Sequence, residues 1–554
     1  MKKQILIILI LVIAFGLSAG SEQASRDRNE AGIYFYFDPF LQQLFPGGFF
    51  YPTIFENFFP ETTSIIEESN GFALLDNPKM YFEGEPVNQF NWYLNGFDIS
   101  SAMNDGSPAV ILPLQTVSTY QLRGETPYNT MFGLDQVSLP EQWRPGSKVE
   151  FSTVFADLGS FSEWSQFFIN TPATERDTFM SQERRKILSN YYINYSYQNA
   201  GKNRLKLDLS YFDMERQFND FNKIGDVYEE NGRLFSAALQ YRRNLNRGNL
   251  DLFAVVNSSD RSNLNAELGV YPQETTDLKR FSLVSGLSLN RKNYKLALWF
   301  IYEKEEKSPY VADYSKDLKD NDGSGFFMPS EFGDFSSASL LASFDMPLRF
   351  NIGDHSDIQL FARFRYSSHQ GDETVNNHNL YLVDSHPFLY REWSVNTDYR
   401  NYSIDTKAGV TAKINLSDRF QLLGKAYLHQ SAVGFSFDRN NLSFMTPSFD
   451  LGFRWMTGKT SSLLVSYGIF GYDLKSNVNR FLEQDRPVST YFYWNDLNND
   501  GAFQQHEKGN VYGYSGGPYH YLAEDVKRPT KQRLLISYNT RLSRNYRLSV
   551  KGTL

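Results

Sequence analysis

The strongest constraint on the fold is a repeated hairpin pattern that fills the chain from residue 147 onward. Segments of seven or more residues alternate apolar and polar side chains, as residues 205–211 and 250–256 do. Short turns rich in Asn and Gly, such as residues 199–203, join these segments in pairs. Alternation with a period of two, bounded by such turns, predicts antiparallel β-hairpins.

The connections between successive hairpins differ from the turns within them, because they are polar and run to roughly 15 to 60 residues. Regular alternation of short turns with long loops is typical of outer-membrane β-barrels, in which the turns face the periplasm and the loops face outward. Aromatic residues make up 16% of the chain, which suits the aromatic girdles of such a barrel. A soluble all-β protein is the alternative, although a sandwich does not sort its loops by length in this way.

The pattern predicts one opening strand and seven hairpins, about fifteen strands in all. Their segments are 149–155, 190–197, 205–211, 234–241, 250–256, 281–289, 296–302, 338–348, 358–366, 407–416, 420–428, 449–455, 462–470, 534–542 and 546–554. Charged side chains within them, such as Lys206 and Lys407, alternate with apolar ones and are expected to face the lumen. Plugged outer-membrane transporters have 22 strands, so we expect a C-terminally truncated chain that lacks about seven strands, or roughly 190 residues.

The N-terminus predicts export. Lys2 and Lys3 precede an apolar run from Ile5 to Phe15, and small residues follow it up to Gly20. About 13 apolar residues are too few to span a hydrocarbon core about 30 Å thick, so the segment is identified as a signal peptide cleaved after Gly20. The net charge of −8 argues against a general nucleic-acid-binding role, and the absence of cysteine excludes disulfides and thiolate metal sites.

A different pattern precedes the barrel. Short strand-like segments alternate with glycine turns and one helix that begins at a proline, which predicts a small α+β unit. In chain order, the elements are a strand ending at Gly84, a hairpin at Asn95-Gly96, a helix from Leu112-Pro113 to Val117, and a strand ending at Arg123-Gly124.

In that order, these elements resemble the plug of the TonB-dependent outer-membrane receptors. The resemblance implies that extracellular loops capture a ligand of unknown identity, that the plug blocks the barrel, and that a TonB-like periplasmic protein drives import. It implies no enzyme activity. No TonB-box-like segment stands between Ser21 and Glu30, so energy coupling stays open. A non-transporting surface or adhesin-like protein and a passive porin are the alternatives.

The predicted fold class is therefore an all-β antiparallel transmembrane barrel, with about 15 strands present of about 22, and a small N-terminal α+β plug. We divide the chain into a signal peptide at 1–20, an N-terminal extension at 21–60, a plug-like domain at 61–146 and an outer-membrane barrel at 147–554. The expected surroundings of the barrel are the lipids of a Gram-negative outer membrane.

Residues 496–507 form the clearest candidate site. They match the twelve-residue calcium loop, which places oxygen ligands at fixed positions around a central glycine. The expected ligands are Asp496, Asn498, Asp500, the Ala502 carbonyl, Gln504 acting through water, and Glu507. The flanking residues are not helical, so we expect structural Ca²⁺ in an extracellular loop rather than an EF-hand. A solvated Asp-Gly turn is the alternative.

Two other patterns carry less weight. Residues 513–517 match Gly-x-Ser-x-Gly, but Pro518 leaves no room for the helix that a nucleophile elbow requires. His369, His378 and His386 fall in one predicted loop at spacings that suit no regular element, so they are expected to be exposed loop side chains.

Overall fold

A computed structural model describes the chain in segments that include all fifteen predicted barrel strands. The described residues are 32–36, 62–65, 79–82, 89–103, 106–113, 116–117, 119–123, 133–137, 145–158, 183–201, 203–219, 227–264, 276–309, 313–317, 333–348, 356–373, 378–383, 386–393, 397–435, 441–458, 460–474, 488–499, 503–516, 527–541 and 547–553. The predicted signal peptide lies outside them. In this part of the chain, no helix is long and apolar enough to cross a membrane.

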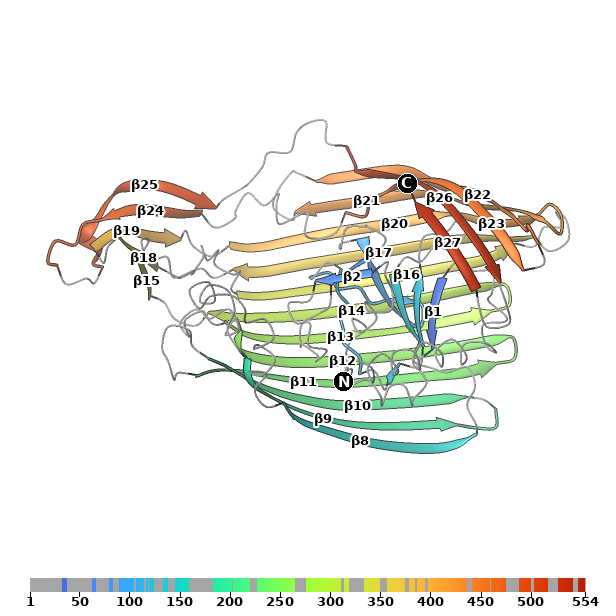
Figure 1. Cartoon of the computed structure of the whole chain (residues 1–554), viewed down its shortest axis with the longest axis horizontal. Helices are drawn as coiled ribbons and strands as arrows, with labels where there is room; N and C mark the ends of the chain where they lie inside the picture. Colours follow the sequence, from blue (N-terminus) through green and yellow to red (C-terminus); the bar gives the residue numbers. More distant parts are fainter. Residues whose placement is uncertain are drawn as a thin grey trace, which may run out of the picture.

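Fifteen antiparallel strands form one continuous curved sheet, which we call the wall (Figure 1). They are β8 (Gly146–Leu158), β9 (Glu183–Gln198), β10 (Arg204–Asn219), β11 (Val227–Leu245), β12 (Gly248–Leu264), β13 (Thr276–Arg291), β14 (Tyr294–Pro309), β16 (Gly333–Leu348), β17 (Asp357–Glu373), β20 (Thr397–Asn415), β21 (Phe420–Phe435), β22 (Leu442–Trp455), β23 (Ser461–Gly471), β26 (Thr530–Arg541) and β27 (Arg547–Thr553). Each predicted segment overlaps one of these strands, which confirms the prediction of fifteen. Among the described strands, β8 and β27 stand at the two edges of the wall.

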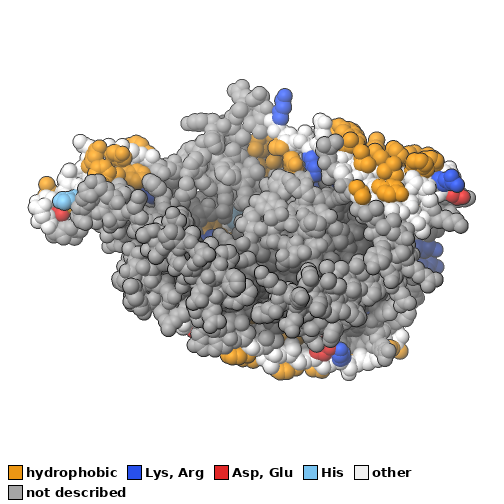
Figure 2. Space-filling view, in the orientation of Figure 1, with side chains coloured by type: hydrophobic (Ala, Val, Ile, Leu, Met, Phe, Trp, Pro, Cys, Tyr) orange, Lys and Arg blue, Asp and Glu red, His pale blue; other side chains and the backbone are white. Residues whose placement is uncertain are grey.

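Side chains on the wall alternate between an outer and an inner face. On β14, Leu296 and Leu298 are 45% and 44% exposed, whereas Ala297, Trp299 and Ile301 between and beyond them are buried. Apolar groups stand out on the surface of the molecule in Figure 2. An apolar outer face around a filled lumen is the arrangement that lipid imposes on a barrel strand.

The second sheet lies inside the curve of the wall. It consists of β1 (Gly32–Tyr36), β6 (Thr119–Arg123), β7 (Gly133–Val137), β4 (Asn91–Leu94) and β5 (Phe97–Asp98), in that order. All of its neighbouring strands are antiparallel except β4 and β7, which are parallel. We call this sheet, with the described residues from 89 to 137, the inner domain. A separate hairpin pairs β2 (Thr62–Ile65) with β3 (Lys79–Phe82).

The third sheet, which we call the outer sheet, is built from three of the long connections between wall strands. Its order is β15 (Asp313–Asp317), β18 (His378–Val383), β19 (His386–Trp393), β24 (Val488–Trp494) and β25 (Lys508–Gly516). It stands beyond the long-loop end of the wall, at the left of Figure 1. Long loops face outward in outer-membrane barrels, so the outer sheet is on the extracellular side.

Candidate functional site

The hairpin between β4 and β5 fixes the tip of the inner domain to the wall. Asn95 and Gly96 have φ angles of 52° and 82°, as a type I′ turn requires and Asn-Gly allows. The Gly96 N–H donates to the Asp135 carboxylate at 3.0 Å, and the Asn95 side chain donates to Gln240 Oε1 of β11 at 3.1 Å. The predicted Asn-Gly hairpin is confirmed, and it is also a contact with the wall.

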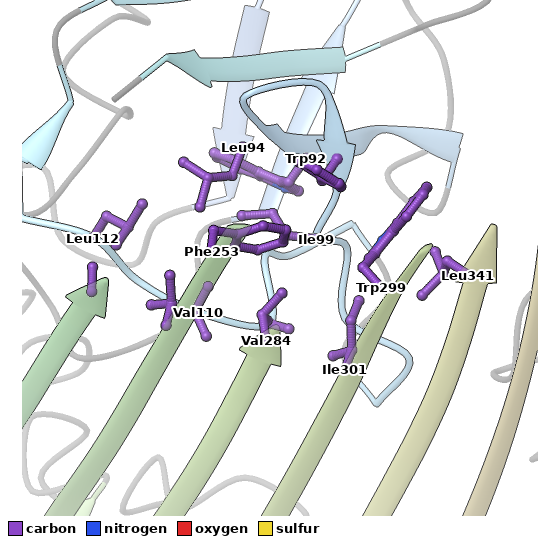
Figure 3. Packing of buried hydrophobic residues seen from close by; sticks show 14 of the residues in the cluster. Trp92, Leu94, Ile99, Val110, Leu112, Phe253, Val284, Trp299, Ile301 and Leu341 are labelled. Atoms are coloured by element: carbon purple, nitrogen blue, oxygen red, sulfur yellow. The ribbon is translucent and has the colours of Figure 1, made fainter. Parts of the chain in front are cut away.

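Most of the contact between the inner domain and the wall is apolar. In Figure 3, Trp92 and Leu94 of β4 lie over the wall strands that carry Val284, Trp299 and Ile301. The buried cluster comprises Phe90, Trp92, Leu94, Phe97, Ile99, Ala109, Val110, Leu112 and Val117 from the inner domain, and Ala238, Phe253, Val255, Val284, Ala297, Trp299, Ile301 and Leu341 from the wall. Burial of each large side chain contributes about 1.5–3 kcal/mol, so this cluster holds the inner domain in the lumen.

Trp299 joins the apolar and polar parts of this contact. Its indole Nε1–H donates to the Asp98 carbonyl at 2.6 Å, and its ring meets the Phe97 ring edge-on with centroids 5.5 Å apart. Phe253 of β12 contacts the same Phe97 ring at 4.5 Å between centroids. Two wall aromatics therefore hold β5 from neighbouring sides.

Glu303 of β14 provides a polar attachment in the same region. Its buried carboxyl accepts hydrogen bonds from the Ser101 hydroxyl at 2.5 Å and the Ala102 N–H at 2.9 Å, both in the inner domain. The Ser337 hydroxyl of the wall donates to it at 3.0 Å. One wall side chain thus fixes two consecutive residues of the inner domain, more than 200 positions away in the sequence.

Wall side chains bind backbone carbonyls on both sides of Pro113. Lys206 Nζ donates to the Thr116 carbonyl at 2.6 Å, and Asn257 Nδ2 donates to the Ile111 carbonyl at 2.7 Å. Within the predicted helix from residue 112 to 117, Thr116 has 3₁₀ conformation and its N–H donates to the Pro113 carbonyl at 2.9 Å, while residues 114 and 115 lie outside the described residues. The predicted lumen-facing orientation of Lys206 is confirmed.

Gln89 connects the start of the inner domain to the far part of the wall. Its side-chain amide donates to the Asp473 carbonyl at 3.1 Å and accepts from the Asp473 N–H at 3.0 Å. The Asp473 carboxylate in turn pairs with Lys407 Nζ at 2.8 Å and lies 3.2 Å from His429 Nε2.

Asp405, His429 and Asp473 are the group of metal-ligating side chains that converges most clearly in the described part of the chain, with ligand atoms within 4.8 Å of one another. Lys407 pairs with both carboxylates, and the Arg528 guanidinium bonds His429 at 2.8 Å. These two cations already balance the two aspartates. The group is therefore a closed ion network, because a buried carboxylate is stable only when a cation faces it.

A cavity of about 260 Å³ remains between the inner domain and the wall, next to this ion network. Tyr93, Gly96 and Asp98 of the inner domain line it together with residues from seven wall strands. Burial, with a further contribution from Asp98, raises the pKa of the Tyr93 phenol above its usual value. Tyr93 therefore presents a neutral hydroxyl to the cavity at neutral pH.

The predicted calcium segment lies in the connection from β24 to β25 of the outer sheet. The Glu507 carboxylate is buried and accepts hydrogen bonds from the Leu497 N–H and the Gln504 N–H, both at 3.1 Å, and from Trp494 Nε1 at 3.2 Å. Asn499 has a φ of 57°, which makes the turn. Glu507 thus draws the two ends of the segment together. It is the last residue of the short 3₁₀ helix η8 (Gln505–Glu507), immediately before β25. Asp500 and Ala502 lie outside the described residues.

Of the three histidines predicted in one exposed loop, His369 lies elsewhere. His369 is buried within β17 and pairs in register with Asn401, so its predicted place in an exposed loop is wrong. The polar residues around it are typical of a lumen-facing strand end as well as of a loop. His378 and His386 begin β18 and β19, and Ser515 lies within β25.

The sequence did not predict the side-chain contacts between the inner domain and the wall. Glu303, Gln89 and Asp473 carry no local motif. The period-two pattern identifies Glu303 as lumen-facing, but the partner of each residue depends on how the inner domain lies in the lumen.

A curved antiparallel wall with an apolar outer face and a small mixed sheet inside it is the architecture of plugged outer-membrane barrels. No family model and no curated protein matches the sequence. Solved structures do match: the outer-membrane transporter YddB from Escherichia coli is 12% identical with a TM-score of 0.57, over 92% of this chain and 67% of the transporter.

Two further matches agree with the first. The closed form of the ferric-catecholate import receptor Fiu from E. coli K12 is 10% identical with a TM-score of 0.52, over 96% of this chain and 80% of Fiu. The ferripyoverdine receptor of Pseudomonas aeruginosa is 11% identical with a TM-score of 0.51, over 94% and 69%. The chain has the fold of the TonB-dependent outer-membrane receptors, and its apolar outer face suits a lipid bilayer.

Proposed function

We propose that this protein is an outer-membrane receptor that binds a ligand at its extracellular end and imports it through the barrel, with the inner domain as the plug. The observation that carries the proposal is the attachment of the inner domain to the lumen side of the wall, through one apolar cluster and a few polar contacts. The fold shared with outer-membrane transporters supports it.

Import requires the plug to leave or rearrange. The apolar cluster resists this, because its separation exposes several large side chains at about 1.5–3 kcal/mol each. Ligand binding alone can shift the plug only as far as the ligand prefers the open state. We therefore propose that a TonB-like periplasmic protein supplies the work that displaces the plug.

The proposal is tested by single-channel conductance in a planar lipid bilayer. The full-length gene product is expected to stay closed, because the inner domain fills the lumen. A variant that lacks residues 21–146 is expected to open a large, stable pore.

Other outcomes of the same measurement support the alternatives. If both proteins are open and conduct equally, there is no plug and the protein is a passive porin. If neither protein conducts while both insert into the membrane, the barrel is a membrane anchor, and a surface or adhesin-like role replaces import.

We also propose that the segment 496–507 binds Ca²⁺ and stabilises the outer sheet. Five of its six predicted ligands carry side-chain oxygens, and Glu507 already draws the ends of the segment together. Oxygen ligands of this kind and number are what Ca²⁺ requires.

Calcium is expected to raise the unfolding temperature of the outer sheet, and EGTA to reverse the change, because binding to the folded state alone stabilises it. Asp500→Asn should weaken Ca²⁺ binding at least about tenfold, measured by titration calorimetry of the full chain in detergent. Asp418→Asn, in an exposed turn at the other end of the barrel, is the matched control. An Asp500→Asn protein that binds Ca²⁺ like the parent would contradict the site.

A further inference from the structure

Four cationic side chains gather at the short-turn end of the wall, opposite the outer sheet (Figure 1). Arg243 lies near the end of β11 and Arg291 is the last residue of β13, and the turns after these strands carry Arg247 and Lys292. Gly248, the first residue of β12, pairs directly with Arg291. The spacing of strands and residues puts the Cα atoms of Arg243 and Arg291 about 12 Å apart. We call these four residues the basic group.

The charge of the basic group is not balanced by nearby carboxylates. None of its four side chains has a hydrogen-bond or ion-pair partner among the residues that the structure describes. In the described part of β11 to β14, Asp251 is the acidic residue closest to these turns. It lies on the lumen side with the buried Phe253 and pairs with Arg242 at 2.5 Å. The basic group therefore creates a positive potential on an otherwise acidic chain, which favours an anion.

Two of the four cations belong to the outer face of the wall. On β11, Leu239 is 45% exposed and Gln240 is buried, so Arg243 shares the outward side of Leu239. On β13, Leu287 is 41% exposed, and Arg291 follows it by four residues on the same side. Both guanidinium groups thus stand at the edge of the surface that faces lipid.

The outer face next to the basic group is apolar. Arg243 pairs in register with Leu250, and one row of side chains continues from there across three strands to Leu289 and Leu296. The neighbouring row, farther from the turns, consists of Tyr241, Leu252, Leu287 and Leu298. Tyr294, 37% exposed, pairs with Arg291 at the border, where amphipathic rings meet lipid headgroups. Leucines, then tyrosine, then cations is the order that suits acyl chains followed by a phosphate.

The other end of the same face has the opposite charge. A row of register partners near the long-loop ends of the strands contains five acidic and two basic residues, which are Asp213, Arg233, Asp260, Lys279, Glu306, Asp334 and Asp372. The outer face is thus net negative at its extracellular end and positive at its turn end. An anionic lipid is favoured at the turn end only.

We propose that the outer face over β11 to β14 binds an anionic phospholipid of the periplasmic leaflet, with its phosphate on the basic group and its acyl chains along the leucine rows. The short turns of an outer-membrane barrel face the periplasm, which puts the basic group at the level of those headgroups. A free phosphate would use the cations alone, whereas here the apolar rows adjoin them. The site goes beyond the proposed import function and does not depend on it.

The test is native mass spectrometry of the full chain in detergent, titrated with dioleoyl phosphatidylglycerol. At low salt, the first phosphatidylglycerol is expected to bind at least about tenfold more tightly than phosphatidylcholine with the same acyl chains, because only phosphatidylglycerol has a net negative charge. Higher salt should reduce this difference. Equal binding of the two lipids at low salt would overturn the proposal.

Arginine variants locate the site. Arg291→Gln should weaken phosphatidylglycerol about fivefold and leave phosphatidylcholine unchanged, and Arg291→Lys should keep the preference because the charge stays. Arg419→Gln removes the same charge from an exposed turn at the same end, between β20 and β21, and should change binding less than about twofold. The side chains of Arg291 and Arg419 form no ion pair with described residues, so both proteins should fold. Equal weakening by the two Gln variants would contradict the site.

A soluble competitor separates the lipid from its headgroup. Glycerol 3-phosphate carries the phosphate without acyl chains, and an excess of about a hundredfold is expected to leave phosphatidylglycerol bound, because burial of acyl chains on the leucine rows adds to the affinity. If glycerol 3-phosphate displaces the lipid at equal concentration, the cations bind phosphate alone and the phospholipid site is wrong.

Discussion

Trp92→Ala is expected to unfold the inner domain and open the barrel, while the wall stays folded. The indole is fully buried, its Nε1–H donates to the Gly106 carbonyl at 2.8 Å, and the Phe90 ring meets it edge-on at 5.5 Å. Loss of a buried tryptophan costs about 3–5 kcal/mol, a large part of the stability of any small domain. Limited proteolysis should cut the inner domain about a hundredfold faster, and the pore should conduct like the variant that lacks residues 21–146.

Trp494→Ala is the matched control for this prediction. Trp494 is also buried and its indole also donates a hydrogen bond, but it belongs to the outer sheet. Its loss should leave the inner domain resistant to protease and the pore closed. A Trp92→Ala protein with a resistant inner domain and a closed pore would show that this tryptophan does not support the plug.

The barrel strands could be predicted because lipid and lumen impose opposite requirements on neighbouring residues. On β14, Leu298 faces outward and Trp299 faces the inner domain, and the sequence records that difference at every second position. The strands extend past the predicted segments because backbone pairing continues beyond the apolar band. Residues 397–406 at the start of β20, for example, are largely polar yet pair with β17.

The outer sheet could not be predicted in the same way. Its strands are short, and β19 pairs with β24 across almost 100 residues of sequence. Its packing depends on local stacking, such as that of Tyr390 on Phe503, with ring centroids 3.6 Å apart. Neither feature leaves a long periodic signal. The contacts between the inner domain and the wall could not be predicted either, because Glu303 and Ser101 meet only once both parts have folded.

Glu230→Ala is expected to destabilise the wall by about 3–5 kcal/mol, the cost of breaking a buried ion pair by removing one partner. The Glu230 carboxylate lies between two arginines of neighbouring strands, 3.0 Å from Arg216 Nη1 and 3.1 Å from Arg261 Nε. All three side chains are buried. The change leaves two guanidinium groups buried without this carboxylate, and the free energy of unfolding in urea measures the loss.

The exposed pair of Asp213 and Arg233 provides the contrast, because it lies on the same two strands, β10 and β11. The two atoms are 3.2 Å apart, but the side chains are 45% and 65% exposed. Asp213→Ala should therefore change the free energy of unfolding by less than about 1 kcal/mol. If Glu230→Ala costs no more than Asp213→Ala, water reaches the arginines at this end of the lumen. If it costs several times more, buried lumen-facing charges stabilise this end of the wall.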